Sequence, residues 1–293
     1  MKKLLIILNP VSGTKKASKN LAEIISLFNR NGFDTKVFVT EKQGDATDAV
    51  KKLSKGVDLI VCSGGDGTLN ETVTGLADGN INIPLGYIPS GTTNDFANSL
   101  KLPANVLKSA KMIIDGKAHS YDVGKFNDRY FCYVASFGAF TKTSYATPQN
   151  IKNALGHISY ILEGIQELSS IKKEHIRIEA DGEIIEDDFL FGAVCNSMTV
   201  GGVLTLDPDV VDMADNKFEI LLIRAPKDIQ ELGECIMAIR NQKYNCNMIT
   251  FRSATNIKIY ANSKMPWSLD GEKASGSDLI EIKNLHKKIT FMH

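Results

Sequence analysis

The sequence has 293 residues, 43% of them apolar, which is enough for two hydrophobic cores of ordinary size. Lysine plus arginine and aspartate plus glutamate each number 34, so the net charge excludes a strongly charged chain and gives no support for a nucleic-acid partner or for strong attraction to anionic membranes. The five scattered cysteines form no C-x-x-C pair, and the first apolar run, residues 4–8, is too short for a signal peptide or a spanning segment, so we expect a reduced, cytoplasmic protein without a transmembrane segment.

The first 122 residues alternate short β-branched runs with longer helical patterns. This alternation is typical of βαβ units around a parallel sheet and predicts a Rossmann-like α/β domain. We expect strands at 4–8, 36–40, 58–62 and 85–88. We expect helices at 16–31, 45–55, 70–78 and 103–115, the last with Pro103 at its first position, and a further helix capped by Asn94-Asp95.

After residue 122 the pattern changes to one that is mainly β. The expected strands are 119–126, 129–136, 175–180, 189–195, 217–223, 248–252, 256–260, 278–282 and 288–291. Helical segments at 150–170 and 227–241 interrupt them.

A glycine-rich loop, Ser63-Gly64-Gly65-Asp66-Gly67-Thr68, follows the third strand and leads into a helix. Its glycines allow positive φ and close backbone approach to a phosphate, and the amides at the helix start attract negative charge. Asp66 would approach phosphates through Mg²⁺ or as a proton-handling group. A tight turn with a capping aspartate is the alternative.

Two more loops follow predicted strands. Ser90-Gly91-Thr92-Thr93-Asn94-Asp95-Phe96 comes after the fourth, and Asn9-Pro10-Val11-Ser12-Gly13 comes after the first. Loops at the carboxyl ends of parallel strands share one edge of the sheet, where open α/β folds bind nucleotides.

Near the C-terminus, Asp270-Gly271-Glu272 places two carboxylates around a glycine between predicted strands. One of them could accept the proton of an acceptor hydroxyl in a phosphoryl transfer. Asp-Gly is equally typical of a two-residue type I′ hairpin turn.

These motifs, in this order, resemble the diacylglycerol kinase catalytic-domain family, which includes bacterial lipid kinases and is related to sphingosine kinases. The resemblance covers essentially the whole chain. It implies an α/β domain followed by a β-sandwich domain with an ATP cleft between them. We therefore expect residues 1–122 to bind the nucleotide, with residues from about 284 to 293 as candidates to return to that domain, and residues 123–283 to carry the catalytic glutamate.

The resemblance also implies an ATP-dependent lipid kinase that uses Mg²⁺. Glu272 would be the general base, with Asp270 and Asp66 as further catalytic carboxylates. The implied nucleotide contacts are Asn9, Ser12, Thr40, Gly64, Gly65, Asp66, Gly67, Thr68, Leu69, Asn70, Glu71, Thr92, Asn94 and Asp95.

Two metal sites follow from the same resemblance. Asp66, Asp95 and Asp122 would organise Mg²⁺ through water, although Asp95 has an alternative as a helix cap. Asp212, Asp215 and the Lys217 carbonyl would hold a second, structural Mg²⁺, where a solvated turn explains the loop equally well.

The expected acceptor is a lipid at the membrane surface, most readily diacylglycerol, reached transiently at the inner face of the membrane by a cytoplasmic protein. Residues 138–148 and Gly201-Gly202 are candidates for the rim of the lipid site. A homodimer is compatible with the sequence, which does not decide it.

Two alternatives remain open. NAD kinase shares the Gly-Gly-Asp-Gly-Thr loop but differs at the second loop. The other is a nucleotide-binding regulator without activity, supported by Asn98, which stands where the family often has arginine.

Overall fold

The computed structural model describes residues 1–13, 15–138, 172–197, 199–200, 204–205, 211–241, 244 and 246–293. The chain divides into two compact units. Met1–Val123 and His286–His293 form the first unit, and Gly124–Leu285 form the second. The predicted helix 150–170, Gly201-Gly202 and all of the predicted 138–148 rim except Gly138 lie outside the described residues.

The first unit contains a parallel sheet in the order β4-β3-β1-β2. The buried strands are nearly continuous apolar runs, as expected for strands covered on both faces, whereas β2 lies at the edge of this order and is only partly buried. The four predicted strands are confirmed as β1 (Lys2–Leu8), β2 (Phe33–Val39), β3 (Leu59–Gly64) and β4 (Leu85–Pro89).

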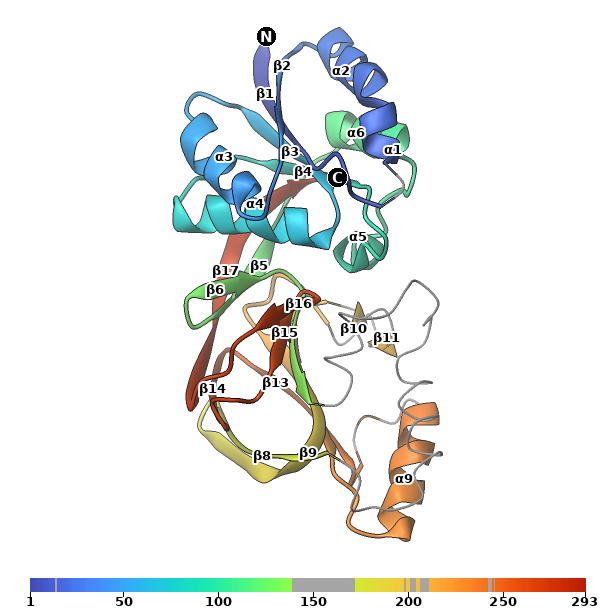
Figure 1. Cartoon of the computed structure of the whole chain (residues 1–293), viewed down its shortest axis with the longest axis vertical. Coiled ribbons are helices and arrows are strands. Elements are labelled where there is room, and N and C mark those ends of the chain that lie inside the picture. The colour runs from blue at the N-terminus through green and yellow to red at the C-terminus, as the bar shows by residue number, and fades with distance from the viewer. Residues whose placement is uncertain are drawn as a thin grey trace. The chain divides into compact units, whose positions relative to one another are not determined.

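Helices cover both faces of this sheet: α2 packs with α6, and α3 packs with α4 (Figure 1). They are α1 (Lys16–Lys19), α2 (Leu21–Arg30), α3 (Asp45–Leu53), α4 (Asp66–Asp78), α5 (Asp95–Ser99) and α6 (Val106–Asp115).

Two helix predictions need correction. The expected helix 16–31 is divided at Asn20, whose backbone is not helical. The helix expected from Pro103 begins at Val106, because the Asn105 side chain accepts hydrogen bonds from the amides of Leu107 (3.1 Å) and Lys108 (3.0 Å) and so caps it there.

The second unit is built mainly from antiparallel strands in the order β16-β15-β7-β9-β8-β14-β17, with β12 between β9 and β13. Strand β9 changes partners near Phe189, pairing with β8 before it and with β7 and β12 after it. Its strands are β6 (Arg129–Phe131), β7 (Val134–Gly138), β8 (Glu174–Ala180), β9 (Glu183–Cys195), β10 (Thr199–Val200), β11 (Leu204–Thr205), β12 (Phe218–Arg224), β13 (Ile249–Ala254), β14 (Asn256–Tyr260), β15 (Trp267–Leu269) and β16 (Glu272–Ala274). Two further strands, β5 (Ala118–Phe126) and β17 (Leu279–Met292), have residues in both units.

Two strand predictions are also corrected. The strand expected at 129–136 is interrupted at Cys132 and Tyr133, which lie between β6 and β7. The strands expected at 278–282 and 288–291 are one strand, β17, whose polar stretch 283–288 hides its continuity in the sequence. The helix expected at 227–241 is confirmed as α9 (Ile229–Arg240).

Aromatic side chains pack together in the core of the second unit. Trp267 is fully buried, and its ring centroid lies 5.0 Å from that of Phe126 and 4.9 Å from that of Phe137. Among the described residues, no helix is long and apolar enough to cross a membrane.

Candidate active site

The carboxyl ends of the parallel strands are aligned in the first unit. Leu8 of β1 is level with both Val39 of β2 and Ser63 of β3, and Gly64 of β3 is level with Pro89 of β4. The loops that follow these strands therefore begin at one edge of the sheet, as the sequence predicts.

Glycines let these loops touch. A Cβ atom added at Gly91 would lie 2.5 Å from the Cα of Gly65, and one added at Gly13 would lie 2.3 Å from the carbonyl oxygen of Ser90. Real Cβ atoms essentially never approach other atoms so closely. All three loops thus meet backbone to backbone, and side chains at these positions would force them apart.

The glycine-rich loop differs from expectation in two respects. Gly64, Gly65 and Gly67 do not adopt positive φ, and Gly65 has a φ of −91°. Helix α4 begins at Asp66, not at residue 70, so Gly67, Thr68, Leu69 and Asn70 belong to the helix. The glycines are needed for space: a Cβ at Gly64 would lie 2.5 Å from that of Thr68. The first-turn amides of α4 precede the regular hydrogen bonds of the helix and therefore have no acceptor within it. They point out of the start of the helix.

The first loop is tied to the other two by side-chain hydrogen bonds. Asn9 Nδ2 donates to Thr68 Oγ1 (3.0 Å), and the hydroxyls of Ser12 and Ser90 are 2.9 Å apart. These contacts bring together the predicted residues Asn9, Ser12 and Thr68.

The second loop folds back on itself. Asn94 Oδ1 accepts from the Gly91 amide (2.9 Å) and Asn94 Nδ2 donates to the Gly91 carbonyl (3.0 Å), so Asn94 occupies the cap position of α5 without capping it through its side chain. Asp95 is the first residue of α5 and is buried, so it is not the cap either. Thr92 is exposed, as is Asn98, whose Nδ2 donates to the Thr93 carbonyl (3.2 Å).

Asp66 and Asp95 lie next to each other. The Asp95 amide donates to Asp66 Oδ2 at 3.2 Å. Asp122 is buried in the first unit: its Oδ1 accepts from the Lys287 amide (2.7 Å) and lies 3.0 Å from His286 Nδ1. The structure therefore places the Asp66 carboxylate on the main-chain amide of Asp95, and the Asp122 carboxylate contacts β17.

Two further predicted nucleotide contacts have structural roles. Glu71 accepts from the amides of Gly44 (2.8 Å, Oε1) and Ala46 (3.2 Å, Oε2), at the start of α3. Thr40, at the end of β2, is buried and its amide donates to the Leu8 carbonyl (2.9 Å).

The loop expected to hold a second cation forms local turns. Asp212 Oδ1 accepts from the Ala214 amide and Asp215 Oδ1 from the Lys217 amide, each at 2.9 Å. The Lys217 carbonyl accepts from Asn284 Nδ2 (3.2 Å). Burial, and then the nearby Asp215, raises the pKa of Glu219 to about 8. Within the described part of the chain, no three His, Cys, Asp or Glu side chains gather in a way that could hold a metal ion.

In the second unit, Asp270 and Gly271 form a two-residue hairpin turn between β15 and β16. Their φ angles, 50° and 84°, are both positive, as a type I′ turn requires, and Leu269 pairs directly with Glu272. The interpretation of this motif as a two-residue hairpin turn is thus correct. The turn places Glu272 at the first position of β16.

The Asp270 carboxylate is buried and accepts from three consecutive amides. Oδ2 accepts from Cys132 (2.6 Å), and Oδ1 accepts from Tyr133 and Val134 (3.0 Å each). These amides form the connection between β6 and β7.

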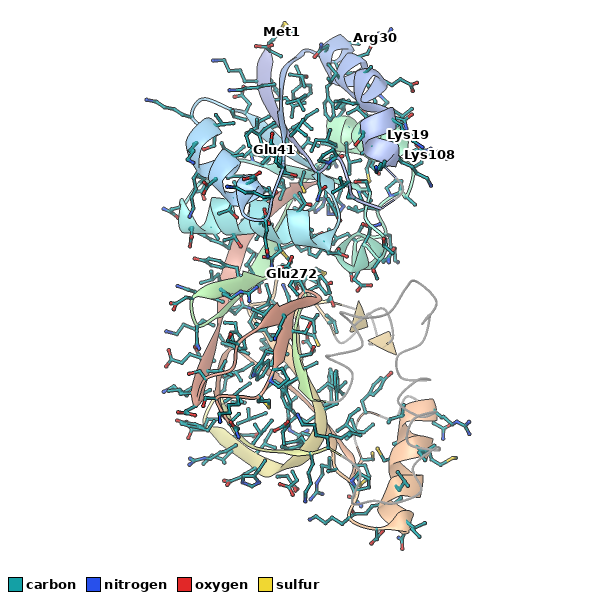
Figure 2. The ribbon with its side chains drawn as sticks, viewed as in Figure 1. Met1, Lys19, Arg30, Glu41, Lys108 and Glu272 are labelled. Carbon is teal, nitrogen blue, oxygen red and sulfur yellow. The ribbon has the colours of Figure 1, made fainter. Side chains whose placement is uncertain are left out.

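Glu272 begins β16 and is about one-third exposed, which suits a group that must meet a substrate (Figure 2). Its Oε2 lies 3.9 Å from Arg129 Nη2, and Arg129 Nη1 donates to the Lys273 carbonyl (3.0 Å). An arginine of β6 therefore lies beside the predicted base.

Sequence reasoning missed a second Asp-Gly-Glu, at Asp181-Gly182-Glu183. It forms the same kind of turn between β8 and β9, with φ of 47° and 93° at its first two residues. Asp181 accepts from the amides of Thr255 and Asn256, each at 2.9 Å. The motif alone therefore does not mark the base, and a search for its repeats would have shown this.

Comparisons with known proteins cover both units. The family model of the diacylglycerol kinase catalytic domain matches residues 3–126, and that of the YegS C-terminal NAD kinase beta sandwich-like domain matches residues 135–281. This order, an α/β part and then a β-sandwich, confirms the predicted fold class.

Relatives match along nearly the whole chain. A diacylglycerol kinase of Bacillus subtilis (strain 168) is 36% identical over 291 residues, which are 99% of this chain and 95% of the relative. One of Staphylococcus saprophyticus is 33% identical over 273 residues, 92% of this chain and 89% of the relative. A crystal structure of a diacylglycerol kinase from Bacillus anthracis superposes with a TM-score of 0.75 at 27% identity, covering 100% of this chain and 96% of that one.

Proposed function

The chain belongs to the diacylglycerol kinase catalytic-domain family of lipid kinases, and from this premise we propose that it transfers the γ-phosphate of ATP to the hydroxyl of diacylglycerol, giving phosphatidic acid. The observation that carries the proposal is the meeting of three strand-end loops through Gly13, Gly65 and Gly91. Such an edge presents backbone amides and hydroxyls to a polyphosphate.

The first-turn amides of α4 are the main candidates for phosphate contact. Their partial positive charge favours an anion at the helix start. Asn9, Ser12 and Thr68 support the same surface, because their side chains bond across the loops. Asn98 offers no charge where the family often has arginine, so the helix start must supply more of the attraction.

Asp66 and Asp95 suit Mg²⁺ that arrives with the nucleotide. Mg²⁺ is commonly bound by one or two carboxylates together with substrate phosphates, and two adjacent carboxylate residues fit this pattern better than a cage made only of protein. When bound, the ion would neutralise charge that develops on the transferred phosphoryl group. The two residues would orient it through their oxygens.

Glu272 is our candidate for the general base. In phosphoryl transfer the protein mainly positions the acceptor and removes its proton, and a partly exposed carboxylate on a rigid hairpin can do both. The proton would pass from the lipid hydroxyl to a Glu272 carboxylate oxygen as the new P–O bond forms and ADP leaves.

Replacing Glu272 with Gln tests this role. We expect kcat to fall by about 10²- to 10⁴-fold, the usual scale for losing a general base, while the KM for ATP stays within about twofold because the nucleotide loops are intact. The measurement is steady-state transfer of phosphate to diacylglycerol in mixed micelles.

Glu183→Gln is the matched control. Glu183 follows the other Asp-Gly turn, and its carboxylate lies 4.0 Å from Arg252, as that of Glu272 lies 3.9 Å from Arg129. It therefore reproduces the local chemistry of Glu272 but has no role in the proposed reaction. Full activity is expected for this variant. Full activity of Glu272→Gln would remove Glu272 from the mechanism.

A further inference from the structure

We propose that Asp270 is a positioning residue: its carboxylate fixes the hairpin that carries Glu272 and neither takes a proton nor binds Mg²⁺. The inference rests on the proposed function, since it concerns the base of that reaction. It changes the role expected for Asp270 from its motif alone.

Main-chain amides already occupy the Asp270 carboxylate. A carboxylate offers about four acceptor positions, and three of them receive the amides of Cys132, Tyr133 and Val134 at 2.6–3.0 Å. Asp270 is only 3% exposed, so these bonds are shielded from water. Hydrogen bonds to a charged acceptor are the stronger kind, and leaving such amides unpaired in the interior is costly.

The main chain of the hairpin also contacts β7. The Asp270 amide donates to the Val134 carbonyl (2.9 Å), so main chain and side chain both bind the connection between β6 and β7. Leu269 also pairs with Ala135 of β7. The turn has only two residues, so Glu272 follows any movement of Asp270.

The connection is held from its other side as well. Arg129 of β6 donates to the Lys273 carbonyl, directly after Glu272. Asp270, in the turn, and Lys273, in β16, are thus both attached to residues 129–134. A displacement of about 1 Å at a reacting group can cost about 10²-fold in rate, so this attachment has a kinetic consequence.

The test replaces Asp270 with Asn. The amide of Asn cannot accept from both sets of donors, so hydrogen exchange at residues 132–134 should speed up markedly. We expect kcat to fall by about 10²-fold and the KM for ATP to change by less than about twofold. Unchanged exchange at these amides would overturn the proposal.

Asp181→Asn is the control for the turn. Asp181 has the same position in the other Asp-Gly turn and binds two consecutive amides, but it carries no proposed base. Its variant should speed exchange at Thr255 and Asn256 and leave kcat unchanged. A loss of kcat equal to that of Asp270→Asn would mean that any loosened turn lowers activity, which contradicts a specific role for Asp270.

The double variant Asp270→Asn/Glu272→Gln separates positioning from chemistry. If Asp270 acts only through Glu272, the double variant should have the kcat of Glu272→Gln within about threefold, because effects of residues that act as a unit do not multiply. Multiplied losses would show an independent catalytic role and overturn the proposal.

If circular dichroism shows that Asp270→Asn is unfolded, Asp270→Glu replaces it: a longer acid could still bind a metal or a proton but cannot place its oxygens on the same amides, and full activity there would contradict positioning. The exchange measurement needs no activity. Full activity of Glu272→Gln would therefore refute the role of Glu272 as general base. The exchange result would still test whether Asp270 holds the amides of residues 132–134.

Discussion

Glycines at the strand ends matter because of what surrounds them. Gly65 has an ordinary φ, yet a Cβ there would lie 3.2 Å from the Cα of Gly91, and the reverse contact is 2.5 Å. The motif predicted glycine for its backbone freedom, but the structure needs it for closeness between loops. This contact joins segments 26 residues apart, and a single sequence contains no sign of it.

Replacing Gly91 with Ala should therefore separate the loops. We expect lower thermal stability and an ATP Kd raised by more than about tenfold, since overpacking typically costs about 1–3 kcal/mol and the phosphate surface would be distorted. Calorimetric titration with a non-hydrolysable ATP analogue measures the affinity.

Gly233→Ala is the matched control, because a Cβ at this position of α9 has no atom within 4 Å. Alanine there should leave nucleotide affinity unchanged and add about 0.5–1 kcal/mol of stability. Equal ATP affinities in the two variants would contradict the close-contact explanation.

At the scale of elements, Glu71 links two helices. It lies on α4, and its carboxylate accepts from Gly44 and Ala46 at the start of α3, while Thr47 Oγ1 donates to the Glu71 carbonyl (2.8 Å). A carboxylate at a helix start satisfies unpaired amides and favours the helix dipole. We infer that Glu71 maintains the α3–α4 pair and does not contact ATP through its side chain.

Glu71→Ala should accordingly lower the free energy of unfolding by about 1–2 kcal/mol, the usual cost of losing such a cap, with little change in the KM for ATP. Urea denaturation gives the first quantity and steady-state kinetics the second. Glu41→Ala, at an exposed side chain nearby (Figure 2), should change the free energy of unfolding by less than about 0.5 kcal/mol. A raised KM at unchanged stability would restore Glu71 as a nucleotide contact.

Elements were predictable where one local signal dominated. The apolar runs of β1, β3 and β4 are buried on both faces and could be read directly from the sequence. The start of α6 was placed wrongly although its cap, Asn105, is local. The boundary between β6 and β7 depends on a distant group, because these strands separate at the amides that Asp270 binds, 136–138 residues away. Single-sequence patterns contain no such long-range partner.

For the whole molecule, the proposed function gives phosphate binding to loops of the first compact unit and proton transfer to Glu272 of the second. The motif order in the sequence was enough to predict the α/β part, the β-sandwich and the family. The second Asp-Gly-Glu shows that the local motif is not enough to identify the base, because Glu183 follows the same kind of turn as Glu272.

The central claim is phosphate transfer from ATP to a lipid hydroxyl. The most direct measurement follows labelled γ-phosphate from Mg-ATP to diacylglycerol, sphingosine, ceramide, undecaprenol and NAD, with the lipids in mixed micelles. We predict labelled phosphatidic acid from diacylglycerol, lost in Glu272→Gln and retained in Glu183→Gln. Label on NAD, or on no acceptor at all, would contradict the account.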